Sequence, residues 1–274
     1  MIIIPTLYTA SGIRHILGYV DVHTGEITTG KPLYVFKPEN IGSKMSIDDK
    51  TIGHGGFTIM SNGDTGKIAL MIESCKIDEV ADAVSLFGRE LDKVQAVGCD
   101  MVSGYLKVCA EELPKAQVVI DKFHVLQYVY DSVLDVRSNI KKELSGNLSK
   151  GKIKTEQDKE ILQKSDVLKH CRYRLTQSPD KWSEAGREAM YDVFRTHKQL
   201  EKVYLLSQNF KKWYARENCV KLKAEIESEL HRWYREVKQA DIKELNSAVR
   251  IIRKHENEIL NFFRSGQSNA KAER

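Results

Sequence analysis

Residues 94–121 read VQAVGCDMVSGYLKVCAEELPKAQVVID, and this stretch decides the fold class. An apolar run stops on Asp100, a helix-periodic segment follows over 103–112, and a second apolar run stops on Asp121. Short apolar runs joined by a helical segment are typical of neighbouring strands in a sheet that carries helices on its faces. The stretch therefore predicts strand, helix and strand within an α/β domain.

Three further strand-like segments precede this stretch, at Met45–Asp48, Phe57–Ser61 and Lys67–Glu73. The Asn62-Gly63 step between the second and third segments is a hairpin signal. An amphipathic segment over 78–91 then leads into the deciding stretch. Three hairpin-like strands followed by helix, strand, helix and strand predict a ribonuclease-H-like mixed sheet with helices packed on its faces.

The chain changes character on either side of this domain. Residues 1–43 hold short extended pieces punctuated by turn signals, which indicate a peripheral lead-in. After His124 the strand signals vanish, and the sequence stays charged and helix-periodic as far as Phe263, with breaks near Ser145 and Ser178. We therefore expect a ribonuclease-H-like core over 44–137, a large all-helical insertion over 138–263, and a C-terminal segment over 264–274.

The charge is distributed unevenly along the 274 residues. Residues 1–121 hold 11 Lys and Arg against 16 Asp and Glu, a net charge of −5, whereas residues 122–274 hold 32 against 22, a net charge of +10. A concentrated basic region suits a polyanion such as nucleic acid. The aromatic residues of the helical region recur among Lys and Arg, so each of them is either a packing anchor or a contact to DNA.

Composition also excludes several classes of protein. The chain has no run of about eighteen apolar residues, and its apolar start is too short for a signal peptide, so we expect a cytoplasmic protein without membrane association. The five cysteines are scattered and show no C-x-x-C spacing, which favours reduced structural thiols over a zinc site or a redox pair.

Asp48 and Asp100 each stand where an apolar strand pattern turns polar. Carboxylates at strand ends gather at one edge of an α/β sheet, and carboxylate oxygens are the ligands that Mg²⁺ prefers. Two metal ions held there can clamp the attacking and leaving oxygens of a phosphodiester. The alternative is a turn former or a helix N-cap, because Asp is common in both.

Three segments carry a family resemblance: Ile47–Asp49, Cys99–Tyr105 and Pro114–Val125. In this order they resemble the successive blocks of bacterial insertion-sequence DDE transposases of the ISL-three type, which carry a helical insertion between the second Asp and the Glu. The resemblance implies that Asp48 and Asp100 are catalytic carboxylates. The third carboxylate of that family lies in an Asn-x-x-x-Glu segment after the insertion, and Asn269–Glu273 matches it.

The family resemblance also implies a reaction and partners. Asp48, Asp100 and Glu273 would hold Mg²⁺ or Mn²⁺ for cleavage at the transposon ends and for strand transfer by the freed 3′-hydroxyl. The partners would be double-stranded DNA at the ends and at the target, with the chain acting as a homo-oligomer on DNA.

Asp121 and His124 form a D-x-x-H pair that resembles one in this and related branches, where its role is supportive. The Asp could fix the His tautomer while the His contacts the DNA backbone, or the pair could cap the following helix. Tyr105, Lys122 and Arg137 lie near the expected site and are either DNA contacts or packing residues. Asp49 alternates to the opposite face from Asp48, which favours a structural role.

The chain departs from the family pattern at both ends. Family members carry a zinc ribbon and a helix-turn-helix ahead of the core, and the Glu opens a helix that continues beyond the position of Arg274. We therefore expect a separately encoded end-binding protein as partner, or, alternatively, a truncated chain that binds DNA or a partner chain without cutting. An unrelated nuclease on the same fold would leave the D-x-x-H and Asn-x-x-x-Glu segments unexplained.

Overall fold

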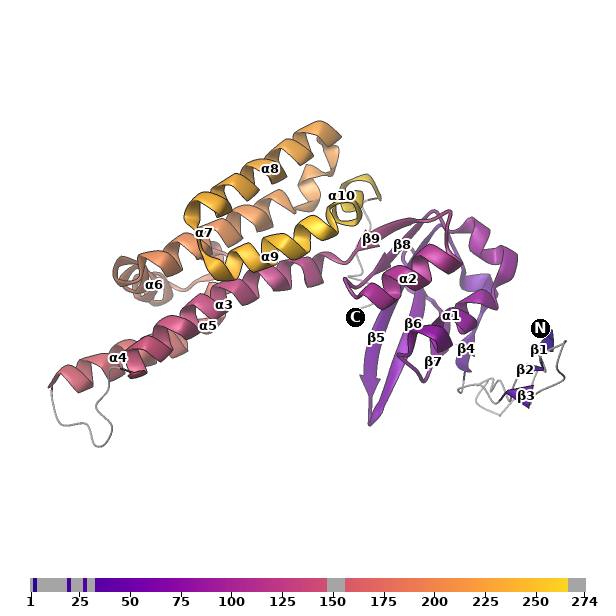
Figure 1. Ribbon diagram of the computed structural model, residues 1–274, viewed down its shortest axis with the longest axis horizontal. Coiled ribbons are helices and arrows are strands. Elements are labelled where there is room, and N and C mark those ends of the chain that lie inside the picture. Colours follow the sequence, from indigo (N-terminus) through magenta and orange to yellow (C-terminus); the bar gives the residue numbers. More distant parts are fainter. Residues whose placement is uncertain (1, 4–18, 21–26, 29–32, 147–155, 266–274) are drawn as a thin grey trace. The chain divides into compact units, whose positions relative to one another are not determined.

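The computed structural model describes residues 2–3, 19–20, 27–28, 33–146 and 156–265. The chain divides into two compact units, which we call the sheet unit (1–124 and 257–274) and the helical unit (125–256). Figure 1 shows the elements of both units with the labels used below.

A six-stranded mixed sheet forms the centre of the sheet unit. Its order is β4-β7-β6-β5-β8-β9, in which β5, β6 and β7 are successively antiparallel, β4 is antiparallel to β7, and β8 and β9 run parallel to β5. This arrangement confirms the predicted ribonuclease-H-like α/β fold. The strands are β4 (Leu33–Phe36), β5 (Lys44–Ile52), β6 (Gly55–Asn62), β7 (Ile68–Ile72), β8 (Ala96–Cys99) and β9 (Gln117–Ile120).

The sheet begins earlier in the chain than Lys44, at which the sequence predicts the core to start. The edge strand β4 pairs with β7 and brings 33–36 into the sheet. Ahead of it, three short strands form a separate antiparallel sheet of order β1-β2-β3. They are β1 (Ile2–Ile3), β2 (Tyr19–Val20) and β3 (Ile27–Thr28).

The turn between β6 and β7 follows from its own residues. The Oδ1 atom of Asn62 accepts hydrogen bonds of 3.0 Å from the backbone N–H groups of Asp64 and Thr65, which closes an Asx turn. Gly66 then adopts φ +75, a left-handed conformation that favours glycine. The hairpin predicted from the Asn-Gly step is therefore confirmed.

One face of the sheet is covered by α1 (Ile77–Ser85) and α2 (Ser103–Glu112). Their apolar sides pack on inward-facing strand residues such as Met45, Ile47 and Val97, all fully buried. The helix predicted over 78–91 is shorter than expected, because the chain leaves helical geometry at Gly88, with φ +53, and continues as a 3-10 segment.

The last described helix, α10 (Glu256–Ser265), forms hydrogen bonds with β9, which is an edge strand of the sheet. The amide of Asn261 accepts a 2.8 Å hydrogen bond from Gln117 and donates one of 2.8 Å to the carbonyl of Val118. Alternation along β9 turns Gln117 away from the core that contains Val118. Thus α10 is fixed to β9 from the side opposite α1 and α2.

The helical unit contains most of α3 (Lys122–Gly146), whose first three residues belong to the sheet unit. The aromatic side chains of this unit mainly build its core: Trp182 stacks on Tyr204, and Phe210 packs on Trp233, whereas Tyr191 stays exposed. The other helices are α4 (Glu156–His170), α5 (Arg172–Leu175), α6 (Glu184–Thr196), α7 (Lys198–Trp213), α8 (Lys223–Ala240) and α9 (Lys243–Lys254).

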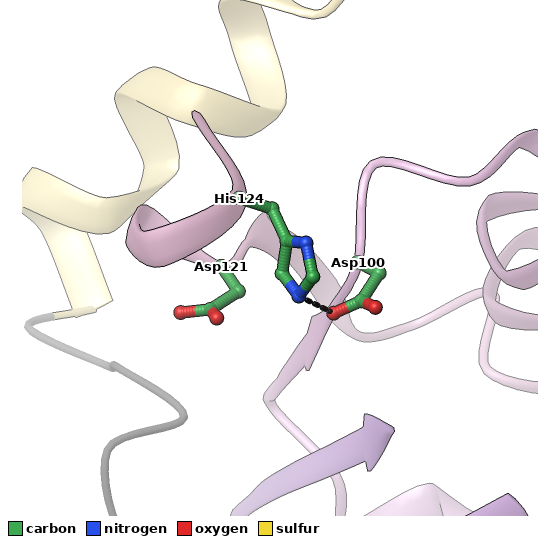
Figure 2. Close-up of side chains that lie close together, drawn as sticks. All are labelled: Asp100, Asp121 and His124. Atoms are coloured by element: carbon green, nitrogen blue, oxygen red, sulfur yellow. Dashed lines mark ion pairs between the residues drawn. The ribbon is translucent and has the colours of Figure 1, made fainter. Parts of the chain in front are cut away.

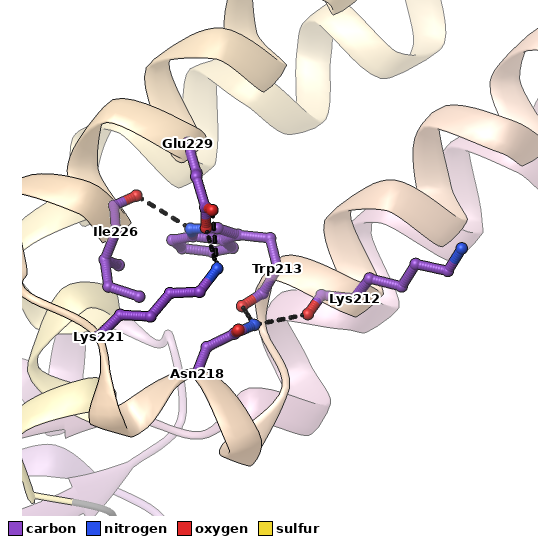
Figure 3. Close-up of polar contacts among 6 residues, drawn as sticks. All are labelled: Lys212, Trp213, Asn218, Lys221, Ile226 and Glu229. Atoms are coloured by element: carbon purple, nitrogen blue, oxygen red, sulfur yellow. Dashed lines mark hydrogen bonds and ion pairs between the residues drawn. The ribbon is translucent and has the colours of Figure 1, made fainter.

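Polar contacts join α7 to α8 (Figure 3). The side-chain amide of Asn218 donates to the carbonyls of Lys212 and Trp213, which closes the end of α7. The indole N–H of Trp213 donates to the carbonyl of Ile226, and Lys221 pairs with Glu229 at 2.7 Å. None of the helices in the described residues is long and apolar enough to cross a bilayer.

Candidate metal centre at the carboxyl ends of the strands

Three aspartates follow three residues that lie side by side in the sheet. Ile47 of β5 pairs with Cys99 of β8, and Cys99 pairs with Ile120 of β9. The parallel register continues one step further, because the backbone N–H of the residue after Ile120 donates to the carbonyl of Cys99 at 2.8 Å. The residues that follow the paired positions are Asp48, Asp100 and Asp121.

Strand alternation sends these three aspartates to one face. Ile47 and Cys99 belong to the core beneath α1 and α2, so the next residue along each strand points the other way. Asp100 and Asp121 are both buried, and the side chain of Asp48 is 13% exposed. The carboxylates predicted from the ends of apolar runs therefore come from adjacent strands and share a face.

The first turn of α3 adds His124 to this edge (Figure 2). Its Nε2 atom lies 2.9 Å from Oδ1 of Asp100, and one ligand atom from each of Asp100, Asp121 and His124 lies within 4.8 Å of the others. These three residues are called the Asp-Asp-His cluster below. The sequence suggested that His124 pairs with Asp121, its partner in the D-x-x-H motif, but the ion pair is made with Asp100.

The Asp-Asp-His cluster fits a divalent cation. The Oδ1 atom of Asp100 is buried and, apart from the imidazole at ion-pair distance, has no hydrogen-bond partner among the described residues. Burying a carboxylate is costly unless its charge is compensated, and a cation would compensate it more fully than the imidazole alone. Two carboxylates with one imidazole form a donor set that Mn²⁺ accepts readily and that Mg²⁺ accepts through its oxygens.

The electrostatics of the cluster act on His124. The pairing with Asp100 raises the pKa of His124 above its ordinary value, against the opposing effect of burial, and the charges of Asp100, Asp121 and Asp48 raise it further. The imidazole is thus surrounded by negative charge from all three strand ends. Such a concentration of carboxylates attracts cations in general.

Asp48 stands one strand away from the Asp-Asp-His cluster. Its Oδ2 atom lies 2.8 Å from Nζ of Lys50, which occupies the same face of β5 two residues later. Sequence reasoning missed Lys50, although its spacing of two from Asp48 along a strand was a usable signal. The ammonium compensates the carboxylate in this structure, and it is 39% exposed.

Tyr105 and Asp49 meet on the opposite face of the sheet, where the core is. Tyr105 is buried, and its hydroxyl contacts the carboxylate of Asp49 and lies 3.0 Å from Oγ1 of Thr58. Burial raises the pKa of Asp49, partly offset by the hydrogen bond from Thr58. These contacts give Tyr105 a structural environment, and the phosphate contact expected for it stays a prediction.

The other two expected DNA contacts also have partners within the chain. Nζ of Lys122 lies 5.5 Å from the ring centroid of Phe262 in α10. Arg137, in the helical unit, donates to the carbonyl of Leu168 at 3.0 Å and to Oγ of Ser138 at 3.3 Å. Their roles toward DNA stay predictions.

The third expected carboxylate, Glu273, lies outside the described residues.

Comparison with known proteins agrees with this fold. A model of the ISL-three-type DDE transposase family, described as transposase, matches residues 45–274. The match begins in β5, just before Asp48, and includes both units. No curated protein and no solved structure gives a significant match. The chain belongs to the ISL-three-type family of DDE transposases.

Proposed function

We propose that this transposase catalyses metal-dependent DNA cleavage and strand transfer at the ends of an insertion sequence, with Asp48, Asp100 and Glu273 as its catalytic carboxylates. The observation that carries the proposal is the register of β5, β8 and β9, which sets Asp48, Asp100 and Asp121 one step after three paired residues. A carboxylate edge of this kind is what a phosphoryl-transfer site needs to collect cations and a phosphodiester.

The position of each residue in the sheet indicates which metal ion it would bind. Asp100 lies between Asp48 and Asp121 in the sheet and is the carboxylate that both metal positions can share. Asp121 and His124 complete one position around Asp100, and Asp48 supplies the other, with Lys50 as its counter-charge until a cation replaces it. Bound Mg²⁺ or Mn²⁺ would activate the attacking oxygen and compensate charge on the leaving oxygen.

Glu273 lies eight residues after the last described residue of the chain. The last described helix, α10, is fixed to β9 through Asn261 and ends at Ser265. The eight residues from there to Glu273 span at most about 29 Å when fully extended. The helix that precedes this segment is thus held beside β9. A phosphodiester of double-stranded DNA is the substrate, and the +10 charge of residues 122–274 would hold its backbone.

The test is cleavage of DNA that carries the ends of the insertion sequence, with Mg²⁺ or Mn²⁺ and with any separately encoded end-binding protein. We expect wild type to cut at the ends. Asp100→Asn keeps the size and shape of the side chain but removes its charge, so it should abolish cutting while DNA binding persists. Glu273→Gln should do the same if Glu273 is the third carboxylate.

The matched control is Asp92→Asn, because Asp92 is an exposed carboxylate of the same sheet unit that pairs with Lys115. It should cut like wild type. Equal cleavage by wild type and Asp100→Asn would overturn the site assignment. Binding without cutting by the wild-type chain would favour the non-cleaving alternative instead.

A further inference from the structure

An exposed aromatic ring stands in the middle of the Asp-Asp-His cluster's own sequence. Phe123 lies between Asp121 and His124, and its side chain is 57% exposed, whereas Asp121 is buried and His124 is paired with Asp100. Among the large apolar side chains that the described part of the sheet unit exposes, Phe123 is the aromatic one. An exposed ring beside a buried polar site is available to contact a ligand.

A second apolar side chain is exposed on the neighbouring strand end. Val102 follows Asp100 by two residues and is 51% exposed, although Met101 between them is buried. The loops after β8 and β9 thus each bring one buried aspartate and one exposed apolar side chain to the same edge of the sheet. Carboxylates that would hold a phosphate through a cation, and apolar groups that suit a base or sugar, therefore lie at the same edge of the sheet.

The backbone on which Phe123 stands is fixed from three directions. The N–H of Asp121 donates to the carbonyl of Cys99, Nζ of Lys122 lies over the ring of Phe262, and His124 pairs with Asp100. The ring of Phe123 itself packs edge-on to the imidazole of His124, with centroids 5.6 Å apart. A ring held in this way presents a preformed stacking surface, which loses little conformational freedom when a ligand binds.

We infer that Phe123 stacks on an unpaired nucleobase of the DNA, next to the phosphate that the Asp-Asp-His cluster would bind through a cation. The inference rests on the proposed function, because it takes the phosphodiester to that cluster. Every base has a π-face, so the contact tolerates any sequence, but it needs a base that has left its pair. Val102 offers a second exposed apolar side chain at the same edge of the sheet. The site therefore prefers DNA whose strands are separated at the reacting phosphate.

The test compares two short DNA probes that share one sequence, a fully paired duplex and a duplex with a few unpaired nucleotides at one end. A 2-aminopurine at the junction reports stacking through its fluorescence. Ca²⁺ serves as the cation, since it binds oxygen ligands. We expect wild type to bind the frayed probe roughly tenfold more tightly than the paired one and to change the 2-aminopurine signal.

Phe123→Ala should lose this preference and the fluorescence change while its affinity for the paired duplex stays as in wild type. Phe123→Trp should keep both, because it restores an aromatic face. The matched control is Tyr191→Ala, which removes an aromatic side chain that is 75% exposed on α6, and it should behave like wild type. Because both substituted side chains are exposed, the variants should fold, which circular dichroism checks.

Two results would overturn the stacking role: a wild type that binds both probes equally, or a Phe123→Ala variant that keeps the preference. Loss of self-association in Phe123→Ala, measured by sedimentation without DNA, would also overturn it, because the ring would then be buried by a second copy of the chain. Failure of the proposed function is distinguishable, since it would appear as equal cleavage by wild type and Asp100→Asn.

Discussion

Nε2 of His124 lies 2.9 Å from Oδ1 of Asp100, so the first turn of α3 is tied to the carboxyl end of β8. The contact assembles a three-residue donor set from two strand ends and a helix. The motif suggests that His124 only supports the site. Its position beside Asp100 allows a further role, because an imidazole there can itself be a metal ligand.

If His124 is a metal ligand, its substitution should weaken the binding of Mn²⁺ and of Mg²⁺ to different extents. Imidazole suits transition metals better than Mg²⁺, which prefers oxygen ligands. His124→Ala should therefore weaken Mn²⁺ binding by roughly tenfold and Mg²⁺ binding much less. Isothermal titration of each metal into the full chain measures both. Equal losses of affinity for the two metals would show that His124 only positions Asp100. The control is His170→Ala, because His170 is an exposed histidine of α4.

The two hydrogen bonds between Asn261 of α10 and strand β9 should stabilise the sheet unit. Asn261→Ala removes two hydrogen bonds of 2.8 Å and leaves their partners in a partly buried position, which costs about 1–3 kcal/mol of unfolding free energy. Urea denaturation measures this loss. Asn257→Ala, an exposed position on the same helix, should be close to neutral. A second substitution, Gln117→Ala, should add less in the Asn261→Ala background than alone.

Gly104 lets α2 approach α1 closely. A Cβ atom at this position would lie 2.2 Å from Cδ1 and 2.4 Å from Cγ1 of Ile77. Overpacking costs about 1–3 kcal/mol, and the better helix propensity of alanine returns about 1 kcal/mol, so Gly104→Ala should destabilise the fold by about 1 kcal/mol. Thermal unfolding measures the change.

The double variant with Ile77→Ala identifies the cause of that loss. Removal of the Ile77 side chain opens the space, so the two effects should not add, and the double variant should be more stable than their sum predicts. Gly146→Ala is the control, because nothing lies within 4 Å of a Cβ atom there. Additive losses in the double variant would exclude the steric explanation.

The thiols should differ in reactivity according to burial. Burial raises the pKa of Cys171 to about 11, so at pH 8 only about one molecule in a thousand carries the reactive thiolate. Cys75 is exposed. Iodoacetamide at pH 8 should therefore modify Cys75 well before Cys171 in the native protein, as mass spectrometry of peptides can show. Modification of both at similar rates would indicate that the helical unit opens around Cys171.

Much of the sheet unit could be predicted from local patterns. The apolar runs located β8 and β9 to within a few residues, helical spacing predicted α2, and Asn62-Gly63 predicted the β6–β7 hairpin. These features depend on residues only a few positions apart, so the sequence alone can predict them. The end of α1 near Gly88 was missed, because a glycine within an apolar period does not show whether the helix continues through it.

The candidate site could be predicted only in part. The sequence by itself determined that aspartates 48, 100 and 121 stand where strands turn polar, in segments whose order resembles that of ISL-three-type transposases. It could not determine which side chains meet. His124 pairs with Asp100, 24 residues earlier, and Asn261 pairs with Gln117, 144 residues earlier.

Only the tertiary structure decided those contacts, and the reason is physical. Inter-strand register, the packing of α10 on β9 and the entry of α3 depend on burial summed over distant segments rather than on local period. Register then decides whether carboxylates on neighbouring strands share a face, and here the pairing of Ile47, Cys99 and Ile120 puts them together. The sequence supplied the chemical groups and their order, and the sheet placed the three aspartates on one face.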